Sequence, residues 1–156
     1  MGSQALERNV TVLIAAVGVR DGGEPPLPRV AHPGDGAVDL VAATAVELAP
    51  GERAAVGTGL AIALPAGFAG LVLPRSGRAL REGVTLINSP GLIDAGYRGE
   101  ITVALVNLDP RHTVSIAVGD RIAQLLIVEV PAISWLAVAR LPGSQRGADG
   151  FGSTGV

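Results

Sequence analysis

Asn88-Ser-Pro-Gly-Leu-Ile-Asp-Ala-Gly-Tyr-Arg-Gly-Glu100 is the stretch that says most about how this chain folds. Its one proline and three glycines argue against a long helix, because proline lacks an N–H donor and glycine weakens a helical backbone. Apolar runs flank it at residues 84–87 and 101–108. This pattern predicts a β-hairpin or a tight loop between two strands.

The same stretch holds one acid, Asp94, and the only tyrosine of the chain, Tyr97. Three positions apart on a stiff turn, the carboxylate and the ring can face one pocket. The alternative is a surface turn in which Asp94 is solvated. A motif this short does not by itself distinguish the two. Other polar stretches of the chain are needed to decide between the two.

The chain has 156 residues, 48% of them hydrophobic, and a formal net charge of −2. A chain of this length forms one domain and buries roughly two thirds of its unfolded surface. The balanced charge provides no basic surface for nucleic acid or for a membrane. Cysteine is absent, which excludes disulfides and thiolate metal sites and fits a reducing, cytoplasmic compartment. His32 and His112 lack the spacing of metal ligands, so we expect both at the surface.

Glycine and proline are frequent, at 22 and 11 residues, yet they lie between short runs rich in Val, Ile and Leu. That pattern predicts an all-β domain with many turns. The apolar run 10–19 is too short to span a bilayer; a buried first strand is expected there, with the core of a signal peptide as the alternative. Other strands are expected at residues 36–40, 40–46, 53–64, 68–73, 84–87, 101–108, 113–118 and 121–130.

Three polar or aromatic features outside the central stretch bear on function. Pro74-Arg75-Ser76-Gly77 leads into one expected helical turn at residues 78–81, which makes it either an anion site or a plain helix cap. Gln124 lies in an apolar run, so its amide either ties two strands together or points into a site. Trp135 is expected to pack in the core or in a subunit interface rather than to serve as a ligand platform.

The end of the chain is rich in glycine and has no apolar period. We expect a β domain over residues 1–142 and a flexible segment over 143–156 that is mobile when nothing is bound. This segment offers an Arg, two hydroxyls, backbone N–H groups freed by glycine and one aromatic ring, a set that suits a triphosphate. It is not a Walker loop, because no Lys follows the glycines. A plain flexible linker is the alternative.

Five stretches, in this order, resemble the five motifs of the trimeric dUTP pyrophosphatase (dUTPase) family. They are Gly36-Ala-Val-Asp39-Leu, Pro74-Arg-Ser-Gly77, Gly91-Leu-Ile-Asp94-Ala-Gly-Tyr97-Arg-Gly-Glu100, Arg121-Ile-Ala-Gln124-Leu and Arg146-Gly-Ala-Asp-Gly-Phe151-Gly-Ser-Thr-Gly155. The likeness extends from about residue 10 to the C-terminus. One departure is the order Gly36-Ala37, where the family usually has Ala-Gly.

The resemblance implies an all-β fold, a jelly-roll-like β-barrel or sandwich with one short helix and a flexible glycine-rich C-terminal tail. It implies a homotrimer with three sites shared between subunits. The implied reaction is hydrolysis of dUTP to dUMP and pyrophosphate with Mg²⁺, which limits uracil incorporation into DNA and supplies dUMP.

The resemblance also implies a role for individual residues. Asp94 would activate the attacking water, and Tyr97 would pack against the deoxyribose and leave no space for a 2′-hydroxyl. The turn from Asn88 to Gly91 would read uracil, largely through backbone groups. Asp39 would contact water molecules on Mg²⁺, which the phosphates mainly hold.

The remaining implied residues bind the triphosphate and cover the base. The α- and β-phosphates would be held by Arg75, Ser76, Gly77 and Gln124. The tail would supply Arg146, Gly152, Ser153 and Thr154 at the γ-phosphate, and Phe151 over the base.

Two other functions stay open from the sequence. A dCTP deaminase is similar in fold, but the Tyr97 and Phe151 motifs argue against it. A catalytically silent jelly-roll trimer with a binding or regulatory role is the second, and the presence of Asp94 and Arg146 argues against that one.

Overall fold

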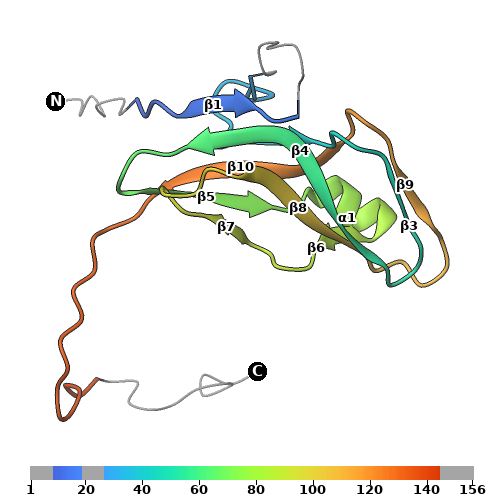
Figure 1. Cartoon of the computed structure of the whole chain (residues 1–156). Helices are drawn as coiled ribbons and strands as arrows, with labels where there is room; N and C mark the ends of the chain where they lie inside the picture. Colours follow the sequence, from blue (N-terminus) through green and yellow to red (C-terminus); the bar gives the residue numbers. More distant parts are fainter. Residues whose placement is uncertain (1–8, 19–26, 145–156) are drawn as a thin grey trace, which may run out of the picture.

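The computed structural model describes residues 9–18 and 27–144, and the regular secondary structure of this part of the chain is strand except for one short helix (Figure 1). In chain order its elements are β1 (Leu13–Ala16), β2 (Ala37–Val41), β3 (Val46–Leu48), β4 (Arg53–Ala63), β5 (Phe68–Leu73), α1 (Ser76–Glu82), β6 (Val84–Leu86), β7 (Gly91–Ile93), β8 (Glu100–Asn107), β9 (Val114–Ile116) and β10 (Arg121–Glu129).

The strands form two four-stranded antiparallel sheets and one small pair. The first sheet has the order β1-β4-β8-β6, the second has the order β2-β10-β5-β7, and β3 pairs with β9 at one end. Strands that are neighbours in a sheet are mostly distant in the sequence, as in a jelly roll. The expected all-β, jelly-roll-like fold with one short helix is therefore confirmed.

One hydrophobic core fills the space between the two sheets. In β4 the buried positions alternate strictly, at Val56, Thr58, Leu60 and Ile62, which is the period of a strand with one face inside. Inward-facing residues of the second sheet, such as Leu125, belong to the same buried cluster. The core thus fixes which face of each strand is left for function.

The central stretch forms a loop between two strands that pair antiparallel, as expected, but the loop is not a simple hairpin turn because it adds a strand to the other sheet. Strand β6 pairs with β8 in the first sheet, whereas β7 pairs with β5 in the second. The chain leaves one sheet after Leu86, adds three residues to the other, and returns at Glu100. This crossing occurs because Gly91 and Ile93 are buried on either side of exposed Leu92, so the short run has its own inner face.

One further expectation is corrected, and for Trp135 one of its two expected places is excluded while the subunit interface stays a prediction. The helix is longer than the turn at residues 78–81, because it begins after extended Arg75 and ends at Gly83, whose φ of 68° is left-handed. Trp135 does not pack in the core of this chain, because 90% of it is exposed.

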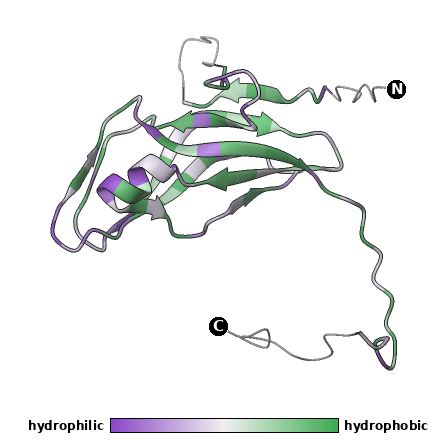
Figure 2. Ribbon diagram, turned by 180° about the vertical axis from the view of Figure 1, so that it is seen from behind, coloured by the Kyte–Doolittle hydropathy of each residue, from purple (hydrophilic) through white to green (hydrophobic). Residues whose placement is uncertain are grey.

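Residues 130–144, here called the C-terminal arm, leave the end of β10 and run away from both sheets (Figure 1). Figure 2 shows that much of this arm is hydrophobic. Its exposed apolar side chains include Ile133, Trp135, Leu136, Val138 and Leu141. Within residues 9–18 and 27–144, no helix has the length and apolar character needed to cross a membrane.

Candidate active site

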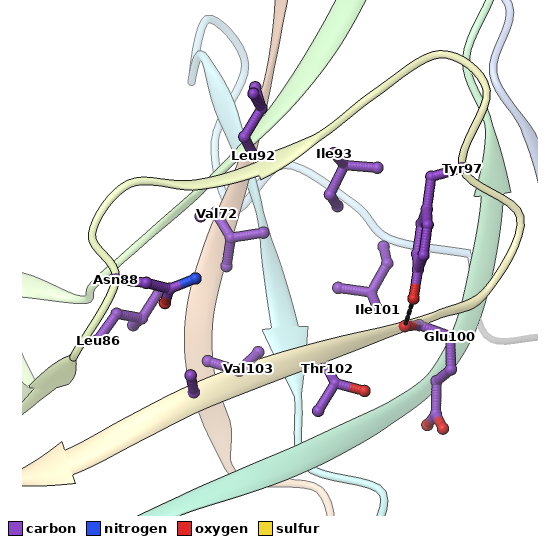
Figure 3. A pocket seen from close by; sticks show the side chains of 12 residues that line it. Val72, Leu86, Asn88, Leu92, Ile93, Tyr97, Glu100, Ile101, Thr102 and Val103 are labelled. Atoms are coloured by element: carbon purple, nitrogen blue, oxygen red, sulfur yellow. Dashed lines mark hydrogen bonds between the residues drawn. The ribbon is translucent and has the colours of Figure 1, made fainter.

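A small cavity lies where the central loop crosses between the sheets (Figure 3). Its volume is about 140 Å³, below the roughly 300–1,000 Å³ of sites for drug-sized ligands, so it suits one ring system rather than a whole nucleotide. The second sheet contributes Val72, Gly91 and Ile93, and the first contributes Ile101 and its β8 neighbours. We call this space the Tyr97 cavity, after the ring at its mouth.

The ring of Tyr97 is held in one orientation by backbone groups. Its hydroxyl donates to the Glu100 carbonyl at 2.9 Å, and its own N–H donates to the Asp94 carbonyl at 3.0 Å. The ring also lies directly over Gly99, where a Cβ would stand 2.7 Å from the ring carbon Cζ. The ring is therefore fixed by the loop, although 45% of the residue is exposed.

Asn88 lies on the far side of the same cavity from Tyr97 (Figure 3), and Gly91 also lines it. A Cβ at Gly91 would come 3.3 Å from Cβ of Val72 and 3.5 Å from Nδ2 of Asn88, so any larger residue would crowd this wall. The loop between them contains a cis peptide bond, Ser89–Pro90. The structure thus brings together three of the residues singled out in the sequence.

Asp94 lies beside this cavity but outside its lining. The carboxylate is exposed at the end of β7 and borders a separate hollow of about 400 Å³, together with Phe68 and Val130. The acid and the ring therefore share one loop while facing different spaces in the single chain.

A second group of polar residues gathers on the second sheet, and we call it the Asp39 cluster. Oδ1 of Asp39 accepts from Nε of Arg75 at 2.9 Å, and Oδ2 lies 3.3 Å from Nη1 of Arg121. Gln124 is paired with Asp39 in the β10–β2 ladder, and both line a hollow of about 370 Å³. Three of the five motif stretches thus meet here.

Ser76 and Gly77 extend this cluster at the start of α1. Ser76 is exposed, and the place of a Cβ at Gly77 is only 3.1 Å from Nη1 of Arg81. The sequence had not marked Arg81 or Arg121 as site residues. Arg81 follows Gly77 by four helical positions, which is a signal that could have revealed it.

The departure in the first motif has no structural cost. Gly36 is not among the glycines with positive φ, and Ala37 does not have a positive φ either. The nearest atom to a Cβ at Gly36 would be Cδ1 of Leu126, at 3.9 Å. The exchanged order is therefore accommodated by ordinary extended backbone.

The two groups line different hollows of the single chain. Leu40, Ala123 and Leu125 are buried in the core, so Asp39 and Gln124, which alternate with them, point to the outer face of the sheet. The Tyr97 cavity opens between the sheets instead, and its lining shares no residue with the hollow at Asp39.

A metal ion is not caged by the described residues, since no group of three or more His, Cys, Asp or Glu among them could hold one. Both carboxylate oxygens of Asp39 are engaged by arginines, so this acid fits contact with an ion through water rather than direct ligation. His32 and His112 are exposed, as expected. The predicted site residues Arg146, Phe151, Gly152, Ser153 and Thr154 lie outside the described part of the chain.

Comparison with known proteins identifies the class. The dUTPase family model matches residues 24–155. The chain is 59% identical over 130 residues to the deoxyuridine 5′-triphosphate nucleotidohydrolase of Thermobifida fusca, covering 83% of this chain and 73% of that one. Fold and match together define an all-β nucleotide hydrolase. The chain belongs to the dUTPase family.

Solved structures show the same fold. A point mutant of the dUTPase of Staphylococcus bacteriophage 80alpha, solved with dUpNHpp, matches with a TM-score of 0.83 and 28% identity, over 94% of this chain and 99% of that one. A mutant dUTPase of S. aureus phage phi11, described as coordinating a structural Mg(II) ion, matches with a TM-score of 0.75 and 24% identity, over 85% and 99% of the two chains.

Proposed function

We propose that this chain hydrolyses dUTP to dUMP and pyrophosphate, which limits uracil incorporation into DNA and supplies dUMP. The observation that carries this function is the family match over residues 24–155, because that range includes all five stretches that the sequence singled out. A small cavity with an aromatic ring at its mouth supports a base as its ligand, with the deoxyribose against that ring.

In the proposed mechanism, Asp94 accepts a proton from the water that attacks the α-phosphorus. Its exposed position at the end of β7 leaves it free to meet water and substrate. One base suffices, because pyrophosphate is a good leaving group when its charge is neutralised. When bound, Mg²⁺ supplies that neutralisation on the phosphates, and Asp39 holds some of the water molecules around it.

The proposed roles of the polar residues follow from their charge and their place. The α- and β-phosphates are bound by the Asp39 cluster and the start of α1, through Arg75, Ser76, Gly77 and Gln124. The γ-phosphate is bound by Arg146, Gly152, Ser153 and Thr154, and Phe151 covers the base. Such contacts fix the phosphorus in line with the water, which supplies most of the catalysis in phosphate transfer.

We propose that the active unit is a homotrimer with shared sites. The Tyr97 cavity and the Asp39 cluster lie on different faces of one chain, which supports a site completed by residues of another subunit. The exposed apolar arm supports the same assembly, because side chains such as Trp135 and Leu136 gain by packing on a neighbour. The division at residue 142 and a cytoplasmic location stay predictions.

The activity is tested by incubating the protein separately with dUTP, dCTP, dTTP and UTP and identifying the products. We expect pyrophosphate release from dUTP to exceed that from dTTP and UTP by far more than the roughly 10–200-fold that one methylene gives in a soft pocket. The reason is that a cavity between two sheets cannot widen for a 5-methyl group or a 2′-hydroxyl. Release of ammonia from dCTP would show a deaminase instead.

Asp94→Asn tests the proposed base, because the amide keeps the shape of the side chain but cannot accept the proton. We expect kcat to fall by roughly 10²–10⁴-fold while the affinity for dUMP is retained. The measurement is turnover with dUTP beside calorimetric binding of dUMP. Near-normal turnover of the variant would assign the base to another group.

A further inference from the structure

Strand β4 is interrupted directly beneath the central loop. Gly57 pairs with Thr102, but the next pair along the ladder joins Ala61 to Glu100, so β4 has a bulge opposite the start of β8. Gly59, inside the bulge, has a φ of +69°. Regular ladder hydrogen bonds are lost at this point, and other groups have to replace them.

Side chains on both strands replace the missing ladder bonds. Oε1 of Glu100 accepts from the N–H of Gly59 at 2.7 Å, and Oγ1 of Thr58 donates to the carbonyl of Ile101, also at 2.7 Å. The Glu100 carboxylate fits only because Gly57 has no side chain, since a Cβ there would stand 2.5 Å from Oε1.

Glu100 connects this bulge to the ring of Tyr97. Its carboxylate points away from the ring toward β4, while its main-chain carbonyl accepts from the Tyr97 hydroxyl at 2.9 Å (Figure 3). The carbonyl can move only if residue 100 moves, and the bond to Gly59 holds that residue in place. The position of the phenol therefore depends on a carboxylate that does not face the cavity.

We propose that Glu100 is a positioning residue that sets how closely Tyr97 approaches the sugar, and hence how strongly the site rejects a 2′-hydroxyl. This inference rests on the proposed function, in which Tyr97 packs against deoxyribose. Glu100 is one of the residues that line the cavity, but its carboxylate binds the N–H of Gly59 on β4. It acts through its own carbonyl and the Tyr97 hydroxyl.

Three variants of the full-length chain test it, with kcat/KM measured for dUTP and UTP. Glu100→Ala removes the acceptor for Gly59, and the ratio of dUTP to UTP should fall by about tenfold, the factor that one net hydrogen bond supplies. Glu100→Gln keeps an acceptor oxygen and should stay within about twofold of the parent. Gly57→Ala keeps Glu100 but displaces its carboxylate, so it should reproduce the loss.

Thr58→Val is the matched control, since it breaks the neighbouring anchor on Ile101 and leaves the Gly59 bond intact. Its unfolding temperature should fall while the dUTP to UTP ratio is kept. An equal loss of selectivity in Thr58→Val and Glu100→Ala would show that any loosening of the bulge has this effect, and it would overturn the proposal. Parent selectivity in both Glu100→Ala and Gly57→Ala would also overturn it.

The two proposals fail in distinguishable ways. A parent that does not hydrolyse dUTP contradicts the proposed function. A parent that does, with variants of unchanged selectivity, contradicts only the role of Glu100. The ratio of binding constants for dUMP and UMP, measured by calorimetry in the same variants, tests the placement of the ring without any turnover.

Discussion

A side chain at Gly99 would meet the ring of Tyr97, which lies over its backbone, whereas Gly96 in the same loop has nothing within 4 Å of the place of a Cβ. In Gly99→Ala the new methyl group meets the movable end of a side chain, so the ring should shift rather than the fold fail. We expect selectivity for dUTP over UTP to fall by roughly tenfold or more, with a small change in stability.

Gly96→Ala is the matched control, and it should leave both selectivity and stability at the parent values. Steady-state kinetics with both nucleotides and thermal unfolding of the two variants provide the comparison. Equal selectivity in the two variants would mean that the ring of Tyr97 does not set the discrimination.

Contacts between residues that are close in the sequence could be predicted. Contacts between residues that are far apart in the sequence could not. Asn88, Gly91 and Tyr97 share one short stretch and lie at one cavity, whereas Asp94, expected to face one pocket with Tyr97, borders another hollow. Arg121 and Glu100 were missed, since their partners Asp39 and Gly59 lie 82 and 41 positions away. Hydrophobic pattern says which face of a strand is inside but not which strand lies beside it.

At the scale of elements, the residue that ends α1 needs both a left-handed backbone and the absence of a side chain. Gly83 has a φ of +68°, and a Cβ there would stand 2.7 Å from the backbone N of Asp109. Gly119 has a φ of +88° with nothing within 4 Å of the corresponding place. The two glycines therefore separate the cost of a left-handed backbone from the cost of a collision.

Gly119→Ala should lower the free energy of unfolding by about 1–2 kcal/mol, the cost of a left-handed alanine. Gly83→Ala should cost distinctly more than that, because backbone at Asp109 cannot move aside like a side chain. Unfolding in denaturant at one fixed protein concentration measures both, since assembly makes stability depend on concentration. Similar losses would show that the turn at Asp109 adapts.

Most strands were predictable because their alternation is regular, as in β4, where buried and less buried residues follow each other over the whole strand. Two strand predictions were wrong: residues 42–45 of the expected strand 40–46 form no strand, and β1, which was expected to be buried, has no buried residue. The strands on either side of the central stretch pair as expected, but the extra strand β7 between them was not predicted, for a physical reason. Strand β7 has only three residues, and its pairing with β5 rather than β8 depends on tertiary packing of Ile93. A local pattern of breakers and apolar residues contains no information about that choice.

At the scale of the whole molecule, the functional groups of the single chain lie in separate places, and its apolar arm is exposed. Asp94 and Tyr97 belong to a loop between the sheets, the Asp39 cluster lies on an outer face, and the arm exposes Trp135. The arm runs away from its own domain before the predicted γ-phosphate residues begin (Figure 1). We therefore predict that Arg146 and the residues after it serve a site on another subunit.

Mixed trimers test this exchange. Full-length chains with Asp94→Asn are co-expressed with chains that end at Leu141 and keep Asp94, each with its own affinity tag, and doubly tagged trimers are isolated. If tails are given to a neighbour, some sites pair an intact Asp94 with a donated Arg146, so the turnover of dUTP should exceed that of both parents.

Trimers in which both chains have Asp94→Asn control for assembly and should stay inactive. Mixed trimers no more active than the parents would show that each tail folds back on its own subunit, because every site then lacks either the base or the γ-phosphate contacts.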